Sequence, residues 1–373
     1  MARDLADAVA GSLTALAAGD CLGLPVEGWQ PGDIERTHGR LVSFYRGAPS
    51  WSDDTQQALI LIEGLAREGR VTPGWFGEAL VARRDAVSGR RFGLHRGTGR
   101  GFRHAVDAYA RTRDWRTSAD PGRVGNGAAM RIAPFAVALQ RDPGADLVRA
   151  VVDATVVTSC DCRSIAAALA VGRAAQAMSE APTLPVDPAD FLDTVALASA
   201  EDAERLPDLL PGILVGIEHV HDCAELLARL AAGASGGGRD GQLDIIQANV
   251  IDALGPGRLA TDGWALGSPI AAIVVAAFAP AVDDGLVTAV NLGGDADSTG
   301  AMVGGILGAA AGVDGLPERL RAFPGYEELI AWGSAAADSK DLGALPDLLD
   351  LERRLSGIAS SLHDGPDNLH HSR

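Results

Sequence analysis

Apolar residues recur every three or four positions along most of the chain, the spacing that places them on one face of an α-helix. Leu5, Val9, Leu13 and Leu16 show this spacing and predict a first core helix over residues 3–18. The same periodicity predicts further helices after Thr55 and over residues 74–87, 128–139, 145–157, 163–179, 188–204, 207–219, 222–232, 242–254, 267–280, 283–290, 325–337 and 344–360.

Glycine, proline and polar residues interrupt this pattern. The first helix is expected to stop at Gly19–Gly23, and a loop to follow until about Ser50. Residues 88–104 are rich in glycine and arginine and predict a loop, which either holds an anion or forms a flexible basic surface. Gly233–Gly241 predicts another flexible loop. Pro134 is expected to kink or restart the helix in which it lies.

Small residues dominate the composition. Glycine accounts for 46 of the 373 residues and alanine is abundant, whereas aromatic residues make up only 5%. This balance favours helices over strands, and helices that pack closely through small side chains. The sequence therefore predicts an all-α fold. No repeat and no linker divides it, so we expect one helical domain over residues 1–340, followed by a C-terminal helix and polar tail over residues 341–373.

The chain carries a formal net charge of −17. General binding to nucleic acid or to an anionic membrane is therefore not expected. The apolar runs Ile270–Val282 and Ala301–Ala311 are shorter than the ~20 residues that a membrane span needs, so we expect them to form core helices. The first residues, MARDLADAV, lack the apolar run of a signal peptide, and we expect a cytoplasmic protein. Its four cysteines are then expected to be free thiols.

Asn291–Gly312 combines a glycine turn, a polar cluster and a helix of small residues. The glycine pair at 293–294 allows a tight turn. Asp295, Asp297 and Ser298 follow, and Asp297 or Ser298 is expected to cap the helix. All three side chains are oxygen donors, which suit a hard cation such as Mg²⁺ or Mn²⁺. The alternative is that this cluster is only a cap and a turn.

The helix that follows has glycines at positions 300, 304 and 308. This spacing of four residues places them on one helical face. Such a face lets another backbone approach closely. We therefore expect a buried helix that holds the polar cluster at its start.

Ser52, Asp53 and Asp54 repeat this arrangement at the start of the second helix. Carboxylates placed there interact favourably with the positive end of the helix. If the two clusters meet, their four aspartates would repel one another and some would bind protons. A pair of divalent cations would remove that repulsion and could polarise a sugar hydroxyl, a phosphate or a bound water.

Other candidate motifs are weaker. Glu218–Cys223 contains histidines at 219 and 221, but these lie on different sides of a helix and no second cluster completes a zinc site. We expect an exposed turn there. Cys160-Asp161-Cys162 lacks the spacing of a redox CxxC motif and is interpreted as structural or as lining a cleft. The chain has no GxSxG nucleophile elbow and no GxxxxGK[ST] phosphate loop.

Several motifs, in this order along roughly residues 5–325, resemble the ADP-ribosylglycohydrolases, a family that includes dinitrogenase reductase-activating glycohydrolase. These motifs are Gly19-Asp20-Cys21-Leu22-Gly23 with Pro25-Val26-Glu27, Ser52-Asp53-Asp54-Thr55, Gly125-Asn126-Gly127 with Ala129-Met130-Arg131-Ile132-Ala133-Pro134, Asn291-Leu292-Gly293-Gly294-Asp295-Ala296-Asp297-Ser298, and Gly315-Leu316-Pro317-Glu318-Arg319.

The resemblance implies a compact, single-domain orthogonal helical bundle with two magnesium ions, or manganese, in a central cleft. It also implies hydrolysis of the bond between C1″ of ADP-ribose and an acceptor group. The metal ligands that it implies are Ser52, Asp53, Asp54, Asp295, Asp297 and Ser298.

Glu27 matches the acid that, in some members of the family, gates the cleft and assists a water molecule. With Asp54 and Asp295 it makes up the catalytic set that the resemblance implies. The expected contacts to ADP-ribose come from Gly125, Asn126, Gly127, Met130 and Ser159.

The chain departs from the family pattern at a few positions. Serine replaces the usual threonine at 52 and 298, which keeps the ligating oxygen. Ser159 stands where the family usually has a histidine near ADP-ribose. A serine hydroxyl is shorter than an imidazole, so we expect either that Asp161, Arg163 or a water compensates, or that the substrate differs.

The leading hypothesis is a Mg²⁺-dependent ADP-ribosyl hydrolase that releases ADP-ribose from an ADP-ribosylated protein or another ADP-ribosylated acceptor. One alternative is a two-metal phosphohydrolase, which would attack phosphorus instead. The other is a non-catalytic ADP-ribose-binding protein, since one scaffold can serve different functions.

Overall fold

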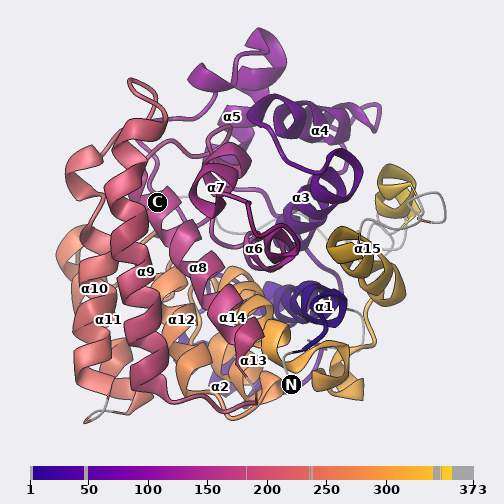
Figure 1. Cartoon of the computed structure of the whole chain (residues 1–373). Helices are drawn as coiled ribbons and strands as arrows, with labels where there is room; N and C mark the ends of the chain where they lie inside the picture. Colours follow the sequence, from indigo (N-terminus) through magenta and orange to yellow (C-terminus); the bar gives the residue numbers. More distant parts are fainter. Residues whose placement is uncertain are drawn as a thin grey trace.

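Two helices from opposite ends of the chain, α1 (Leu5–Gly23) and α14 (Ala296–Ala311), pack along each other through the centre of the molecule (Figure 1). The computed structural model describes residues 3–45, 49–181, 183–234, 236, 238–338, 345 and 347–354. All residues of α1 from Ala8 onward are buried, as are all residues of α14 except Ala311. This pair is therefore the centre of the hydrophobic core.

Glycines make the close contact between these two helices possible. A Cβ atom on Gly304 would lie 2.0 Å from the carbonyl oxygen of Ala15, and a Cβ on Gly308 would lie 2.3 Å from that of Gly11. At the other end, a Cβ on Gly300 would lie 2.7 Å from the carbonyl oxygen of Gly19. The predicted face of glycines at every fourth position is thus confirmed as a backbone-to-backbone contact.

A layer of long helices covers one side of this pair. It consists of α9 (Pro188–Leu209), α10 (Asp222–Ala234) and α11 (Arg239–Leu254), at the left in Figure 1. Between this layer and the central pair lie α8 (Cys162–Glu180) and α12 (Ser268–Phe278), which contact both.

The other side is covered by shorter helices. These are α3 (Asp53–Glu68), α6 (Ala133–Ala138) and α15 (Tyr326–Asp338), which contact α1, with α4 (Pro73–Asp85), α5 (Arg100–Thr112) and α7 (Leu147–Thr155) beyond them.

The part of the chain that the structure describes also contains α2 (Pro31–His38), α13 (Val282–Asn291) and the short 3₁₀ helices η1 (Leu24–Val26), η3 (Trp115–Thr117), η4 (Leu139–Arg141), η5 (Ile217–His219), η6 (Val313–Gly315) and η7 (Glu318–Leu320). No β-strand occurs in the part of the chain that the structure describes; two isolated bridges join Gly125 to Trp264 and Asp161 to Val215. The predicted all-α, single-domain fold is confirmed.

The sequence predicted that the first helix stops where the Gly19–Gly23 segment begins. In the structure the helix continues through this segment to Gly23. Gly19 and Gly23 both face the backbone of α14, at residues 300 and 296. The tertiary contact with α14 therefore outweighs the low helix propensity of glycine.

The region expected to be a loop until Ser50 contains α2. This helix begins with Pro31 at its first position, which suits the fixed φ of proline, and it ends at Gly39, which has a φ of 65°. Ile34 is its one buried residue. Because a single buried residue gives no periodicity, the hydrophobic pattern did not reveal this helix.

The separate helix predicted over residues 207–219 is wrong. Helix α9 runs through Pro207 and ends at Leu209, and Gly212 and Gly216 then adopt positive φ angles of 76° and 67°. Few residues other than glycine tolerate this conformation, so the chain turns there before the short η5.

Three other boundaries differ from the sequence predictions. Helix α5 begins at Arg100, inside the predicted 88–104 loop, and α11 begins at Arg239, inside the predicted 233–241 loop. Within 128–139, residues 128–132 form turns and α6 begins only at Ala133, with Pro134 in its first turn, so the predicted helix starts later than expected and is not interrupted by Pro134. Residues 348–354 are helical, and the rest of the predicted 344–360 helix and the tail lie outside the described residues.

One stretch, Leu5–Val26, is long and apolar enough to cross a membrane when judged by length and composition alone. Its most apolar window is 89% buried within the protein. This burial is typical of a core helix. The two shorter apolar runs that the sequence singled out also form core helices, α12 and α14, as predicted.

We expect Gly304→Ala to destabilise the protein, because the new methyl group would meet the Ala15 carbonyl oxygen at 2.0 Å. Overpacking of this kind lowers the free energy of unfolding by about 1–3 kcal/mol. The matched control is Gly241→Ala in α11, where nothing lies within 4 Å of the new atom. There the higher helix propensity of alanine should stabilise the protein slightly. Urea denaturation measures both; equal stability of the two variants would contradict a glycine-dependent contact.

Candidate active site

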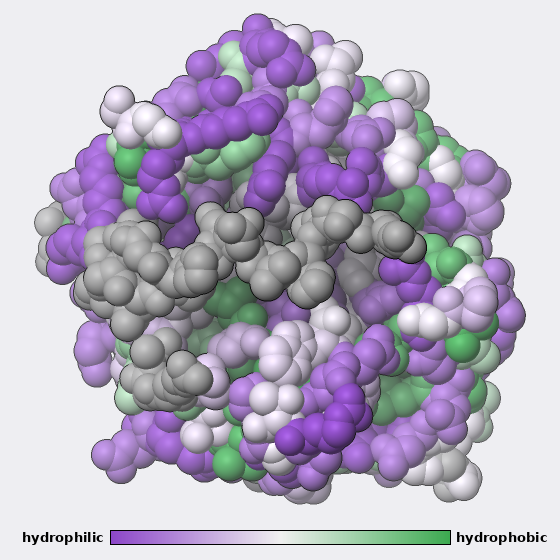
Figure 2. Space-filling view, turned by 180° about the vertical axis from the view of Figure 1, so that it is seen from behind, coloured by the Kyte–Doolittle hydropathy of each residue, from purple (hydrophilic) through white to green (hydrophobic). Residues whose placement is uncertain are grey.

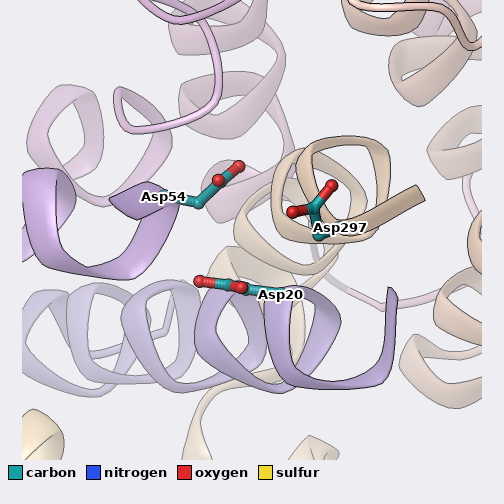
Figure 3. Close-up of side chains that lie close together, drawn as sticks. All are labelled: Asp20, Asp54 and Asp297. Atoms are coloured by element: carbon teal, nitrogen blue, oxygen red, sulfur yellow. The ribbon is translucent and has the colours of Figure 1, made fainter. Parts of the chain in front are cut away.

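The starts of α3 and α14 meet beside the C-terminal half of α1 (Figure 3). Ser52 caps α3, and its side-chain oxygen accepts a hydrogen bond from the amide of Asp54. Asp295, rather than the predicted Asp297 or Ser298, occupies the capping position of α14, and Asp297 lies in its first turn. The positive ends of both helices therefore point at the same group of carboxylates.

A cleft of about 480 Å³ opens over these two helix starts. All of the predicted site residues except Ser52 line it. Ser52 is buried beneath the cleft, where its hydroxyl lies 3.0 Å from Oδ2 of Asp54. The structure thus brings together residues that are up to 271 positions apart in the chain, between Glu27 and Ser298.

The carboxylates form two groups that share Asp297. In the first group, oxygen atoms of Asp20, Asp54 and Asp297 lie within 4.8 Å of one another. In the second, oxygen atoms of Glu27, Asp295 and Asp297 do so. Figure 3 shows the first group, in which the side chains converge from α1, α3 and α14.

One oxygen atom in this cluster lacks a partner. Oδ1 of Asp54 is buried and accepts no hydrogen bond among the described residues. A buried carboxylate oxygen without a partner is costly, and it is the arrangement expected where a cation supplies the missing interaction. Oxygen donors of this kind suit Mg²⁺ or Mn²⁺. The residues present therefore fit a pair of hard divalent cations.

Asp20 supports the cluster from below, and the sequence had not assigned it a role in the site. Its carboxylate accepts hydrogen bonds from the amide of Ser52 at 2.9 Å and from the amide and hydroxyl of Thr55 at 3.1 and 2.6 Å. It is fully buried. Asp20 therefore fixes the first turn of α3 against α1, and with it the position of Asp54.

Asp53 is held by a chain of polar side chains. Gln57 donates a hydrogen bond to Oδ2 of Asp53 at 2.8 Å. Arg131 donates to Gln57, and also to the hydroxyl of Thr158 at 2.8 Å. Neither Gln57 nor Arg131 was predicted as a site residue, yet both line the cleft. The only sequence signal for this row of hydrogen-bonded side chains was the motif that contains Arg131.

Asp295 is held by the predicted ADP-ribose loop. The side-chain amide of Asn126 donates to Oδ2 of Asp295 at 2.7 Å and to the hydroxyl of Ser268 at 2.9 Å. A Cβ on Gly263 would lie 2.7 Å from the same Oδ2. Asn126 thus positions a carboxylate in addition to lining the cleft.

Glu27 follows η1 and faces the cleft from a more exposed position. The next residue, Gly28, donates to the carbonyl oxygen of Gly294 at 2.7 Å, and Gly294 donates to that of Trp29 at 2.9 Å. These bonds tie the Glu27 segment to the turn that precedes α14. Glu27 is therefore held close to Asp295.

Burial and mutual repulsion raise the pKa of these acids. Burial, followed by the charges of Asp295 and Asp20, raises the pKa of Glu27 to about 7. Burial and the charge of Asp20 raise the pKa of Asp53 to about 8. The pKa values of Asp54 and Asp297 are also raised well above the usual range, mainly by burial. Without cations the cluster therefore holds protons at neutral pH.

Ser159 lines the cleft at the position where a histidine was expected. Asp161 and Arg163 do not compensate for it directly. They pair with each other at 2.9 Å at the start of α8, and neither is among the residues that line the cleft. Neither residue therefore replaces the expected histidine in the cleft.

Of the remaining sequence candidates, only part of the 88–104 segment lines this cleft. His219 lies 3.2 Å from Asp222 and His221 lies 3.8 Å from Glu204, and both histidines are partly exposed between α9 and α10. The four cysteines are free and buried, as predicted. Part of the 88–104 segment contributes to the cleft through Gly97, Gly99, Gly101 and Phe102.

A helical fold with a carboxylate-lined cleft of this kind defines a class of hydrolases that act on ADP-ribosylated substrates. The sequence profile of the ADP-ribosylglycohydrolase family matches residues 1–347, so the chain belongs to that family. The resemblance drawn from the sequence motifs is confirmed.

Two relatives and one solved structure are similar to this chain. The ADP-ribosylarginine hydrolase Tri1 of Pseudomonas putida is 25% identical over 338 residues, covering 87% of this chain and 75% of its own. An uncharacterised protein of Archaeoglobus fulgidus is 27% identical over 312 residues, covering 82% and 87%. The structure of an ADP-ribosylglycohydrolase-related protein complex matches with a TM-score of 0.63 and 25% identity, covering 90% of this chain and 99% of that chain.

We expect Asp20→Asn to weaken both the fold and cation binding, because an amide cannot replace a carboxylate that accepts several hydrogen bonds. A lost bond to a charged acceptor costs about 1.5–3 kcal/mol in the free energy of unfolding. Thr55→Val, which deletes only one donor, should cost less. Denaturation and Mg²⁺ titration calorimetry measure these effects. Unchanged Mg²⁺ affinity in Asp20→Asn would show that Asp20 does not position the ligands.

The stability of the metal-free protein should fall as the pH rises from 5 to 8. The folded acids, with pKa values raised to about 7 for Glu27 and about 8 for Asp53, bind protons that the unfolded chain has already released. The free energy of unfolding therefore decreases over this range. Thermal unfolding in chelator measures this decrease, and added Mg²⁺ should raise Tm more at pH 8 than at pH 5. A Tm that rises with pH in chelator would contradict the buried, repelling cluster.

Proposed function

We propose that this protein is a Mg²⁺-dependent ADP-ribosyl hydrolase, which cleaves the bond between C1″ of ADP-ribose and an acceptor group and releases ADP-ribose. The observation that carries the proposal is the pair of carboxylate groups sharing Asp297, at the base of a cleft in an ADP-ribosylglycohydrolase fold. The Pseudomonas putida relative is named for ADP-ribosylarginine, so an arginine side chain is the first acceptor to test.

The residues that would hold the cations are the predicted ligands Ser52, Asp53, Asp54, Asp295, Asp297 and Ser298, of which Asp54, Asp295 and Asp297 belong to the two carboxylate groups. Asp20 belongs to the first carboxylate group and would supply a further oxygen ligand there. When bound, divalent cations polarise coordinated hydroxyl groups and lower the pKa of coordinated water.

Glu27 would move the proton. It is the most exposed acid of the two groups, and it faces the cleft next to Asp295 and Asp297. As the oxygen of a water molecule bonds to C1″, Glu27 accepts a proton from that water. The bond from C1″ to the acceptor breaks with its electron pair on the acceptor, which takes up a proton in turn.

The wall of the cleft would hold the substrate. Asn126 is fixed by its hydrogen bonds to Asp295 and Ser268. The glycines on either side of it have no side chain, so a ribose or a phosphate could approach the backbone there. Met130 lies against Ser298, with its sulfur 3.8 Å from the serine hydroxyl. Ser159, whose side chain is shorter than the expected histidine, also lines the cleft.

Glu27→Gln should lower turnover of an ADP-ribosylated arginine peptide by about 10²–10⁴-fold, the usual contribution of general acid–base catalysis. Binding of ADP-ribose should change much less, because the carboxamide keeps the size of the side chain. The matched control is Glu35→Gln in α2, an exposed acid outside the cleft, which should keep full activity. Mass spectrometry of the products and calorimetry with ADP-ribose measure these effects.

The same assay distinguishes the alternatives. Free ADP-ribose supports the proposal, whereas phosphate-containing fragments would identify a phosphohydrolase. Binding without any product would identify a binding protein. Chelation should abolish activity and Mg²⁺ should restore it; full activity after confirmed removal of metal would exclude the cation requirement.

A further inference from the structure

A basic segment contrasts with the acidity of the rest of the chain. Residues 83–123 contain eleven arginines, four aspartates and no lysine or glutamate, a net charge of +7. The whole chain carries −17, so the remainder carries −24. Positive charge is thus concentrated in one part of the sequence, and the active site uses none of its exposed arginines except Arg123 at the rim of the cleft.

Helix α5 orders this charge on one face. Its buried side is formed by Ala105, Val106, Ala108 and Tyr109. On its opposite side, polar residues recur every three to four positions and border a groove of about 670 Å³, here called the arginine groove. This groove is lined by Arg100, Arg103, His104, Asp107 and Arg111 of α5 and by Arg91 and Phe92, which precede the helix. The upper part of the molecule, where Figure 1 shows α4 and α5, is mostly hydrophilic in Figure 2.

Most of the positive charge in the groove is not neutralised. Asp107 is the one acid that lines it, and Asp107 already pairs with Arg84 at 2.9 Å and with Arg91 at 3.1 Å. No carboxylate of the described residues forms an ion pair with Arg100, Arg103 or Arg111. Such a cluster of exposed guanidinium groups attracts anions, and each group can bind a carboxylate or a phosphate with two hydrogen bonds.

The arginine groove lies next to the active-site cleft. Gly99, Gly101 and Phe102, which line the cleft, alternate with the groove residues Arg100 and Arg103 at the start of α5. The cleft and the groove are therefore on two sides of the same helical turn. A macromolecule whose ADP-ribose enters the cleft would place its neighbouring residues over the groove.

We propose that the arginine groove docks an acidic segment of the ADP-ribosylated protein, beside the residue that carries ADP-ribose. This inference rests on the proposed function, since it concerns the target of the same site. Arginine forks match carboxylates in geometry and in charge. The groove thereby selects targets by the sequence around the modified residue, which the cleft does not contact.

The size and surroundings of the groove favour a protein over nucleic acid. Helix α5 has 13 residues and a length of about 20 Å. A longer polyanion would extend past the helix onto the rest of the chain, which carries a net charge of −24. Because charges are screened within about 8 Å at physiological ionic strength, the attraction stays local to the groove. A short acidic segment gains this attraction without meeting the repulsion.

Direct binding tests the groove without any requirement for catalysis. The probe is an unmodified, fluorescently labelled 12-residue peptide with six glutamates, compared with the same peptide with six glutamines. Wild-type protein should bind the glutamate peptide more tightly, and salt should weaken that binding. The double variant Arg100→Gln/Arg111→Gln should lower its affinity roughly three- to tenfold, since each exposed ion pair contributes modestly.

The matched control is Arg70→Gln/Arg229→Gln, which removes the same charge at two exposed positions outside residues 83–123. It should leave peptide affinity unchanged. Equal affinity for the glutamate and glutamine peptides, or equal loss in both double variants, would overturn the docking inference. Tighter, groove-dependent binding of a 12-nucleotide single-stranded DNA would overturn it in favour of nucleic acid.

Hydrolysis separates this inference from the proposed function. With peptides that carry ADP-ribosylated arginine, Arg100→Gln/Arg111→Gln should raise KM for an acidic context and leave kcat unchanged. Cleavage of free ADP-ribosylated arginine should not change. If the wild type cleaves no ADP-ribosylated substrate but binds the glutamate peptide through the groove, the proposed function fails alone. If it cleaves acidic and neutral contexts equally well, the docking inference fails alone.

Discussion

The backbones of α1 and α14 lie so close together that only glycine fits at several points between them. This contact is the constraint on which the site depends, because it sets Asp20 of α1 next to Asp297 of α14. A methyl group added at Gly304 would lie 2.0 Å from the carbonyl oxygen of Ala15, so the two helices would have to separate. The same glycines therefore determine the core packing and the spacing of the carboxylates.

The site is electrostatically unfavourable in the absence of cations. Burial and mutual repulsion raise the pKa of Glu27, Asp53, Asp54 and Asp297, and Oδ1 of Asp54 has no hydrogen-bond partner among the described residues. The fold tolerates this arrangement because helix ends and fixed donors surround it. The charged, pre-organised cluster lowers the free energy of unfolding, and enzymes commonly have active sites that reduce stability in this way.

Charge is distributed unevenly on a larger scale as well. One wall of the cleft is formed by Gly97, Gly99, Gly101 and Phe102, which belong to the arginine-rich segment of residues 83–123. This separation places an arginine-rich surface next to a carboxylate-lined cleft. A substrate that is itself anionic, such as an ADP-ribosylated protein with an acidic neighbourhood, is compatible with both surfaces at once.

The sequence by itself determined the helical class, because small and apolar residues with helical spacing and few strand formers leave little else possible. It also determined most of the candidate ligands, since Ser52–Asp54 and Asp295–Ser298 each stand at a helix start, where carboxylates are stabilised locally. The motifs in their order were sufficient to indicate the family. In each case the information lies within a few consecutive residues.

Tertiary structure alone decided the rest. Asp20 was not recognised because its role depends on Ser52 and Thr55, which are more than thirty residues away. The continuation of α1 through Gly19 depends on α14, and the hydrogen bond between Gln57 and Arg131 joins α3 to the turn that precedes α6. A contact between distant segments leaves no periodicity in either segment, so local patterns cannot reveal it. The sequence determined which groups are available, and the packing of α1 against α14 decided which of them meet.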